Sequence, residues 1–96
     1  MSNLVNGNVV TGVATGTATS TTVTLGFQPS AVNVLNVTTN KEYDLVNGAT
    51  NIKIITGSTG VITYSAAASG VSLSMLSNGF KAASSASDEL VYTAIR

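Results

Sequence analysis

The stretch that decides the fold class lies at residues 71–82 and has the sequence VSLSMLSNGFKA. Its apolar residues at positions 71, 73 and 75 alternate with serines, and this period of two is typical of a half-buried strand. The pair Asn78-Gly79 is typical of a tight turn. Phe80 to Ala82 then begins another strand, so the stretch predicts a strand, a turn and a strand.

The same signals continue in both directions. Val61 to Tyr64 could form a strand, while Tyr64 to Ser69 has helical propensity but is too short for a stable helix. Gly12 is a candidate β-bulge. The pattern predicts an all-β, single-domain β-sandwich or jelly roll of seven to eight short strands over residues 9–96. Further strands are expected at Val9–Thr15, Thr21–Leu25, Ala31–Thr38, Lys41–Val46, Ile52–Ile55 and Glu89–Ile95.

Residues 1–8 differ from the rest in composition. They are rich in asparagine, and Leu4 and Val5 are the apolar side chains that follow Met1. Such a segment cannot bury enough surface to offset the entropy of ordering, about 1–2 kcal/mol per residue, unless something else binds it. We therefore expect an N-terminal arm at residues 1–8.

The residue inventory argues against several classes of function. The 96 residues include no Cys and no His, which removes the usual nucleophile–base pairs and the commonest transition-metal ligands. We therefore expect no enzymatic activity, no cofactor and no metal site. The formal net charge is zero, whereas nucleic-acid binding needs a basic patch, so no nucleic-acid partner is expected. No run of 18 apolar residues exists, and no membrane partner is expected.

Polarity comes from neutral side chains. Charged residues make up 8% of the chain, against about 25% in an average soluble domain. The chain instead contains 14 Thr, 12 Ser and 9 Asn. Because little charge repulsion keeps copies apart, self-association is expected.

Few side chains could support chemistry. Glu42 and Asp44 lie two apart and would share one face of a strand, as a glycosidase pair or half a calcium site would require. The favoured interpretation is two solvated charges flanked by Lys41. Asp88 and Glu89 are expected to be ordinary loop acids. The tyrosines could form a sugar-binding platform, although core or subunit contact is favoured.

Two segments resemble a known family. Residues 24–36, TLGFQPSAVNVLN, are similar to a Leu-Gly-Phe-x-Pro signature followed by Val-x-Val-x-Asn. Residues 77–81, SNGFK, and residues 88–94, DELVYTA, resemble a C-terminal pattern in which Gly-Phe-x-Ile is followed by an acidic loop and then by Leu-x-Tyr-x-Ala. In this chain Ala82 stands where Ile is usual. Together they resemble the small head decoration, or cement, proteins of tailed bacteriophages and cover about half the chain.

The resemblance implies a structural virion protein on the outer surface of the capsid. Its partners would be the major capsid protein and further copies of itself, with a homotrimer the expected assembly. The arm would supply capsid contacts through Leu4, Val5, Asn6 and Asn8. The alternative is a β-sandwich adhesion module of a phage tail fibre or spike that binds a host glycan.

Overall fold

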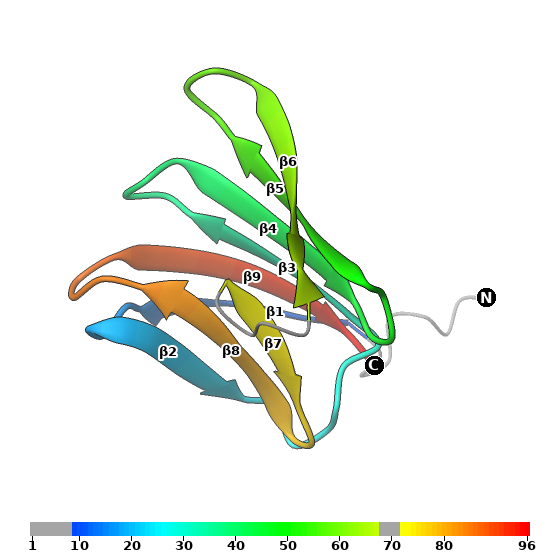
Figure 1. The fold of residues 1–96 in the computed structure, drawn as a ribbon. Helices are drawn as coiled ribbons and strands as arrows, with labels where there is room; N and C mark the ends of the chain where they lie inside the picture. The colour runs from blue at the N-terminus through cyan, green and yellow to red at the C-terminus, as the bar shows by residue number, and fades with distance from the viewer. Residues whose placement is uncertain (1–8, 68–71) are drawn as a thin grey trace.

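The computed structural model describes residues 9–67 and 72–96, and these form nine strands in two antiparallel sheets (Figure 1). The larger sheet has six strands in the order β1-β9-β3-β4-β5-β6, and the smaller has three in the order β2-β8-β7. The prediction of an all-β sandwich is confirmed, with one or two strands more than expected. The strands are β1 (Val9–Thr15), β2 (Thr19–Thr24), β3 (Ala31–Asn36), β4 (Lys41–Val46), β5 (Asn51–Thr56), β6 (Val61–Ala66), β7 (Leu73–Leu76), β8 (Gly79–Ser84) and β9 (Glu89–Ile95).

The core lies between the sheets and follows from the alternation in the sequence. Along β3, Val32 and Val34 face the smaller sheet, and their neighbours in the chain face the opposite side. Phe80 of β8 packs edge-on against Tyr92 of β9, with ring centroids 5.3 Å apart. The buried apolar residues are Val32, Val34, Leu45, Ile52, Leu73, Phe80, Ala82, Leu90 and Ala94.

Gly12 does not form the expected bulge. The register between β1 and β9 continues without interruption from Val9 opposite Ile95 to Thr15 opposite Glu89. A β-carbon at position 12 would instead lie 2.7 Å from Cζ of Tyr92. The glycine therefore makes room for the Tyr92 ring.

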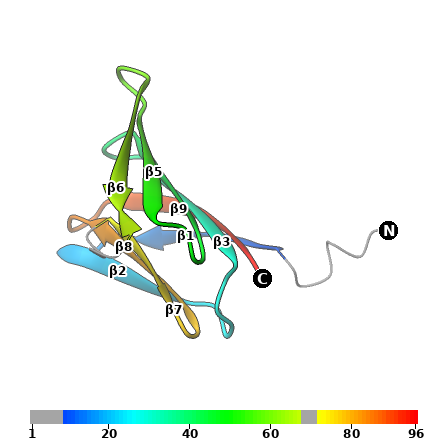
Figure 2. The same cartoon turned by 45° about the vertical axis from the view of Figure 1, so that its right-hand side comes forward.

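The stretch from Tyr64 is extended, since β6 continues to Ala66. Pairing with β5 satisfies the backbone hydrogen bonds of these residues. A helix of this length would not be stable alone. In both views the hairpin of β5 and β6 rises away from the smaller sheet, which contacts β1, β3, β4 and β9 (Figures 1 and 2). Within the described ranges, no helix is long and apolar enough to cross a membrane.

Candidate interaction surface

The smaller sheet covers one face of the larger sheet, and the opposite face carries no other part of the described chain (Figures 1 and 2). We call this opposite side the outer face. The alternation that directs Leu90 and Ala94 into the core directs Val91 and Ile95 to the outer face. A row of register partners crosses all six strands on this face: Val13, Val91, Leu35, Glu42, Ile55 and Ile62.

Five of the six side chains in this row are apolar, and several are well exposed. Val13 on β1 keeps 66% of its surface accessible and Ile62 on β6 keeps 50%. At the opposite end of the strands, Ile95 and Val46 flank the small side chain of Ala31. This difference in size leaves a hollow of about 270 Å³ in the outer face, into which a partner could insert a side chain.

A polar cluster lies between these apolar groups. The side-chain amide nitrogen of Asn33 on β3 donates to Glu42 Oε2, at 2.5 Å, and also to Asp44 Oδ1. Lys53 of β5 is the register partner of Asp44. The two carboxylates share a strand face, as predicted, but both are half-buried and held by Asn33, so the expectation of freely solvated charges was wrong. Lys41 lies on the opposite face of the sheet from the two carboxylates, because its register partner on β3 is Asn36, which faces the core side.

This cluster offers carboxylate acceptors, and Lys53 on the neighbouring strand places a cation on the same face. Among residues 9–67 and 72–96, no group of three or more acidic side chains is placed to hold a metal ion. The cluster fits a partner surface that supplies hydrogen-bond donors to the carboxylates.

Asp88 lies at a second polar position, on the core side. It is 5% exposed, and its Oδ2 accepts hydrogen bonds of 2.9 Å from Asn36 Nδ2 and from the Ser85 backbone. The Asn36 bond and then the Ser85 bond hold the pKa of Asp88 below its usual range. Burial and then the nearby Asp88 charge raise the pKa of Tyr43. The expectation of an ordinary loop acid was therefore wrong for Asp88.

The contacts of Asp88 indicate a structural role. Its backbone accepts from Gly16, and Ser87 donates to the Gly16 carbonyl. Its carboxylate joins the loop before β9 to the end of β3. Sequence reasoning missed this position because Asn36 and Asp88 are 52 residues apart. The one available signal was an asparagine at the end of a largely apolar strand.

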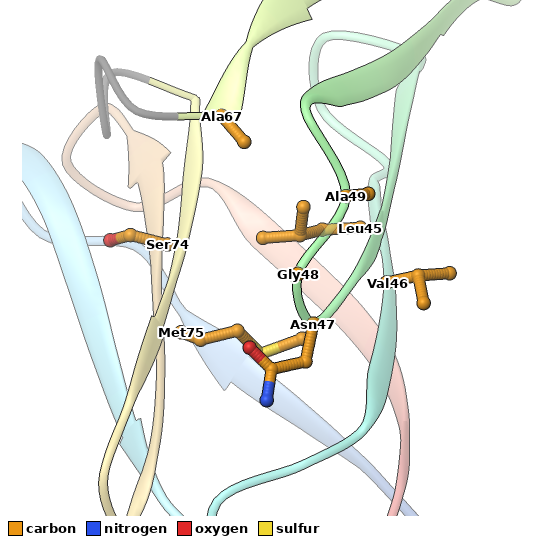
Figure 3. A pocket seen from close by; sticks show the side chains of 8 residues that line it. All are labelled: Leu45, Val46, Asn47, Gly48, Ala49, Ala67, Ser74 and Met75. Atoms are coloured by element: carbon orange, nitrogen blue, oxygen red, sulfur yellow. The ribbon is translucent and has the colours of Figure 1, made fainter.

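A cavity of about 340 Å³ opens where the sheets separate near the turn after β4 (Figure 3). Leu45 points into it and Met75 approaches from β7, whereas Val46 points away. None of the lining residues is titratable, so the cavity offers no acid–base chemistry. The lining residues are Leu45, Val46, Asn47, Gly48, Ala49, Ala67, Ser74 and Met75.

The four residues expected to contact a capsid, Leu4, Val5, Asn6 and Asn8, lie outside the described residues. No family model, curated protein or solved structure matches the chain.

Proposed function

We propose that the protein is a structural virion protein that binds the outside of a tailed-bacteriophage capsid and stabilises it. The observation that carries the proposal is the uncovered outer face, with its apolar row and its hydrogen-bonded carboxylates. The resemblance of the two sequence segments to head decoration proteins supports the same function. The major capsid protein would be the partner of the outer face.

The size of the outer face indicates how such binding would work. Six strands about 4.8 Å apart, each about 20 Å long, give a face of about 600 Å². A stable interface buries about 800 Å² on each partner, so one copy would bind weakly alone. Repeated contacts on a closed shell would add avidity. Self-association and capsid contacts by the N-terminal arm belong to the same proposal.

The test is co-sedimentation with undecorated heads from a phage or prophage that lacks this gene. Val91→Lys introduces a charge between Val13 and Leu35 in the apolar row and should weaken binding by about tenfold or more, which corresponds to 1.4 kcal/mol. The matched control is Thr24→Lys, which places the same charge at an exposed position on the smaller sheet. It should bind as the wild type does.

Equal binding by both variants would exclude the outer face as the attachment surface. Binding of the isolated protein to host glycans, with none to heads, would contradict the proposed function and favour the adhesion module.

A further inference from the structure

Strand β6 is one edge of the six-stranded sheet, and the sequence of Val61 to Tyr64 contains none of the residues that normally protect such an edge. Its sequence, VITYSA, has no charge, no proline and no glycine. Edge strands usually carry a charge, a proline or a bulge, because an open edge is a template for another strand. Val61 to Tyr64 are exposed, with 66% of the Tyr64 surface accessible. The other edge, β1, borders the start of the smaller sheet at β2.

The hydrogen-bond pattern identifies which backbone groups face outward. The Ala67 amide donates to the Thr50 carbonyl, and the Gly57 amide donates to the Asn40 carbonyl. Hydrogen-bonded pairs alternate along antiparallel strands. Both bonds then lead to the same assignment, in which positions 61, 63 and 65 bond to β5. The amides and carbonyls of Ile62 and Tyr64 therefore point away from the sheet.

We propose that β6 pairs antiparallel with β6 of a second copy about a two-fold axis at Thr63. In this register Ile62 lies opposite Tyr64 of the second copy and exchanges both backbone hydrogen bonds with it. The symmetric pair repeats the exchange, which gives four new hydrogen bonds. It is the one two-fold register that places Ile62 of one copy opposite Tyr64 of the other.

The side chains fit the same register. Ile62 and Tyr64 both lie on the outer face, so each copy contributes to two pairs of an aromatic and a β-branched side chain, a favourable combination across strands. The Thr63 side chains meet on the axis, on the other face. Val61 to Tyr64 stand clear of the smaller sheet, so a second copy can approach edge-on (Figures 1 and 2).

The contact is small. About 20 Å of paired strand belongs to the class of interfaces that bury less than about 1,200 Å², which are weak and transient. The dimer should therefore depend on protein concentration. A two-fold contact gives a dimer, whereas we expected a trimer from the sequence.

The test uses the absence of cysteine from the chain. Thr63→Cys in the full-length protein creates one thiol, which can form a disulfide only with another copy. Residues opposite each other in a pair without hydrogen bonds have Cα atoms about 4.5 Å apart, within the range for disulfides. Mild oxidation should convert most of this variant to a covalent dimer on a non-reducing gel.

Two controls define the contact. Thr22→Cys, at an exposed position on β2, should run as a monomer on the same non-reducing gel. Tyr64→Cys should cross-link at least tenfold more slowly than Thr63→Cys, because its opposite residue is Ile62. Equal cross-linking of the three variants, no cross-linking at Thr63, or a trimer by sedimentation would overturn the proposal.

A fourth variant breaks the contact. Ile62→Pro removes only an outward-facing amide, and proline is tolerated at such edge positions. It should abolish concentration-dependent dimerisation in sedimentation while the β circular dichroism spectrum remains. Persistent dimerisation of a folded Ile62→Pro protein would also refute the pairing. The test of β6 pairing is independent of the test of the proposed function, because head binding is measured with variants that lie outside β6.

Discussion

Replacing Gly12 with alanine tests how closely the larger sheet is packed around Tyr92. The new β-carbon would lie 2.7 Å from Cζ and 3.1 Å from Cε2 of the Tyr92 ring, closer than carbon atoms normally approach. The ring cannot swing away freely, because it also packs edge-on against Phe80 at an interplanar angle of 67°. Phe80 itself is 1% exposed.

Two effects of the substitution oppose each other. Alanine in a strand is favoured over glycine by about 0.5–1 kcal/mol. Crowding in a packed region costs roughly 1–3 kcal/mol, and the aromatic pair at risk contributes about 0.5–1.5 kcal/mol. The crowding should prevail, with a net loss of about 1–2 kcal/mol in the free energy of unfolding. In a domain of this size each kcal/mol lowers the melting temperature by roughly 4–8 °C.

The assay is chemical denaturation of a double-mutant cycle with Tyr92→Leu. In the Tyr92→Leu background the aromatic ring and its crowding are gone, so Gly12→Ala should stabilise by about 0.5–1 kcal/mol and the sign of its effect should reverse. If Gly12→Ala stabilises the wild-type background, or has the same effect in both backgrounds, the proposed crowding is wrong.

Two further predictions concern Asp88 and the N-terminal arm. The pKa of Asp88 is lowered in the fold, so its ionised form stabilises the protein above its ordinary pKa of about 4, and this contribution is lost as the pH falls through the lower folded pKa. Melting temperatures should therefore drop in this acidic range, and less steeply for Asp88→Asn; equal slopes would contradict this. Deleting Met1 to Asn8 should leave the melting temperature unchanged within about 2 °C, because the described sheet begins at Val9, but weaken head binding. Global unfolding of the truncated protein would show that the segment belongs to the fold, and unchanged binding would exclude it as a contact.

The sequence predicts three of the strands at their observed bounds. β1, β4 and β9 have the predicted bounds, and Glu42 and Asp44 of β4 share a strand face as predicted. Where the alternation is weak, the local pattern fails. The alanines after Ser65 suggested a helix, and only pairing with β5 extends the strand to Ala66. Strand order could not be predicted, since β9 inserts between β1 and β3 from the far end of the chain.

The polar positions were harder to predict than the core. The spacing of Glu42 and Asp44 placed them on one face, but their partner Asn33 lies on another strand and depends on the register of β3 with β4. The partnership of Asn36 with Asp88 likewise requires the assembled sheet and the loop before β9. Alternation gives the face of a residue, whereas its neighbour across the sheet is set by tertiary pairing.

Glu42 gives the outer face a selectivity that an apolar sheet face would lack. It interrupts the apolar row between Leu35 and Ile55, so the apolar side chains form two patches. A partner that covered both patches would also bury this carboxylate, which is costly unless the partner supplies a donor beyond that of Asn33. An unrelated apolar surface would lack such a donor. Glu42 thus disfavours non-specific aggregation and favours a partner with a hydrogen-bond donor between two apolar contacts.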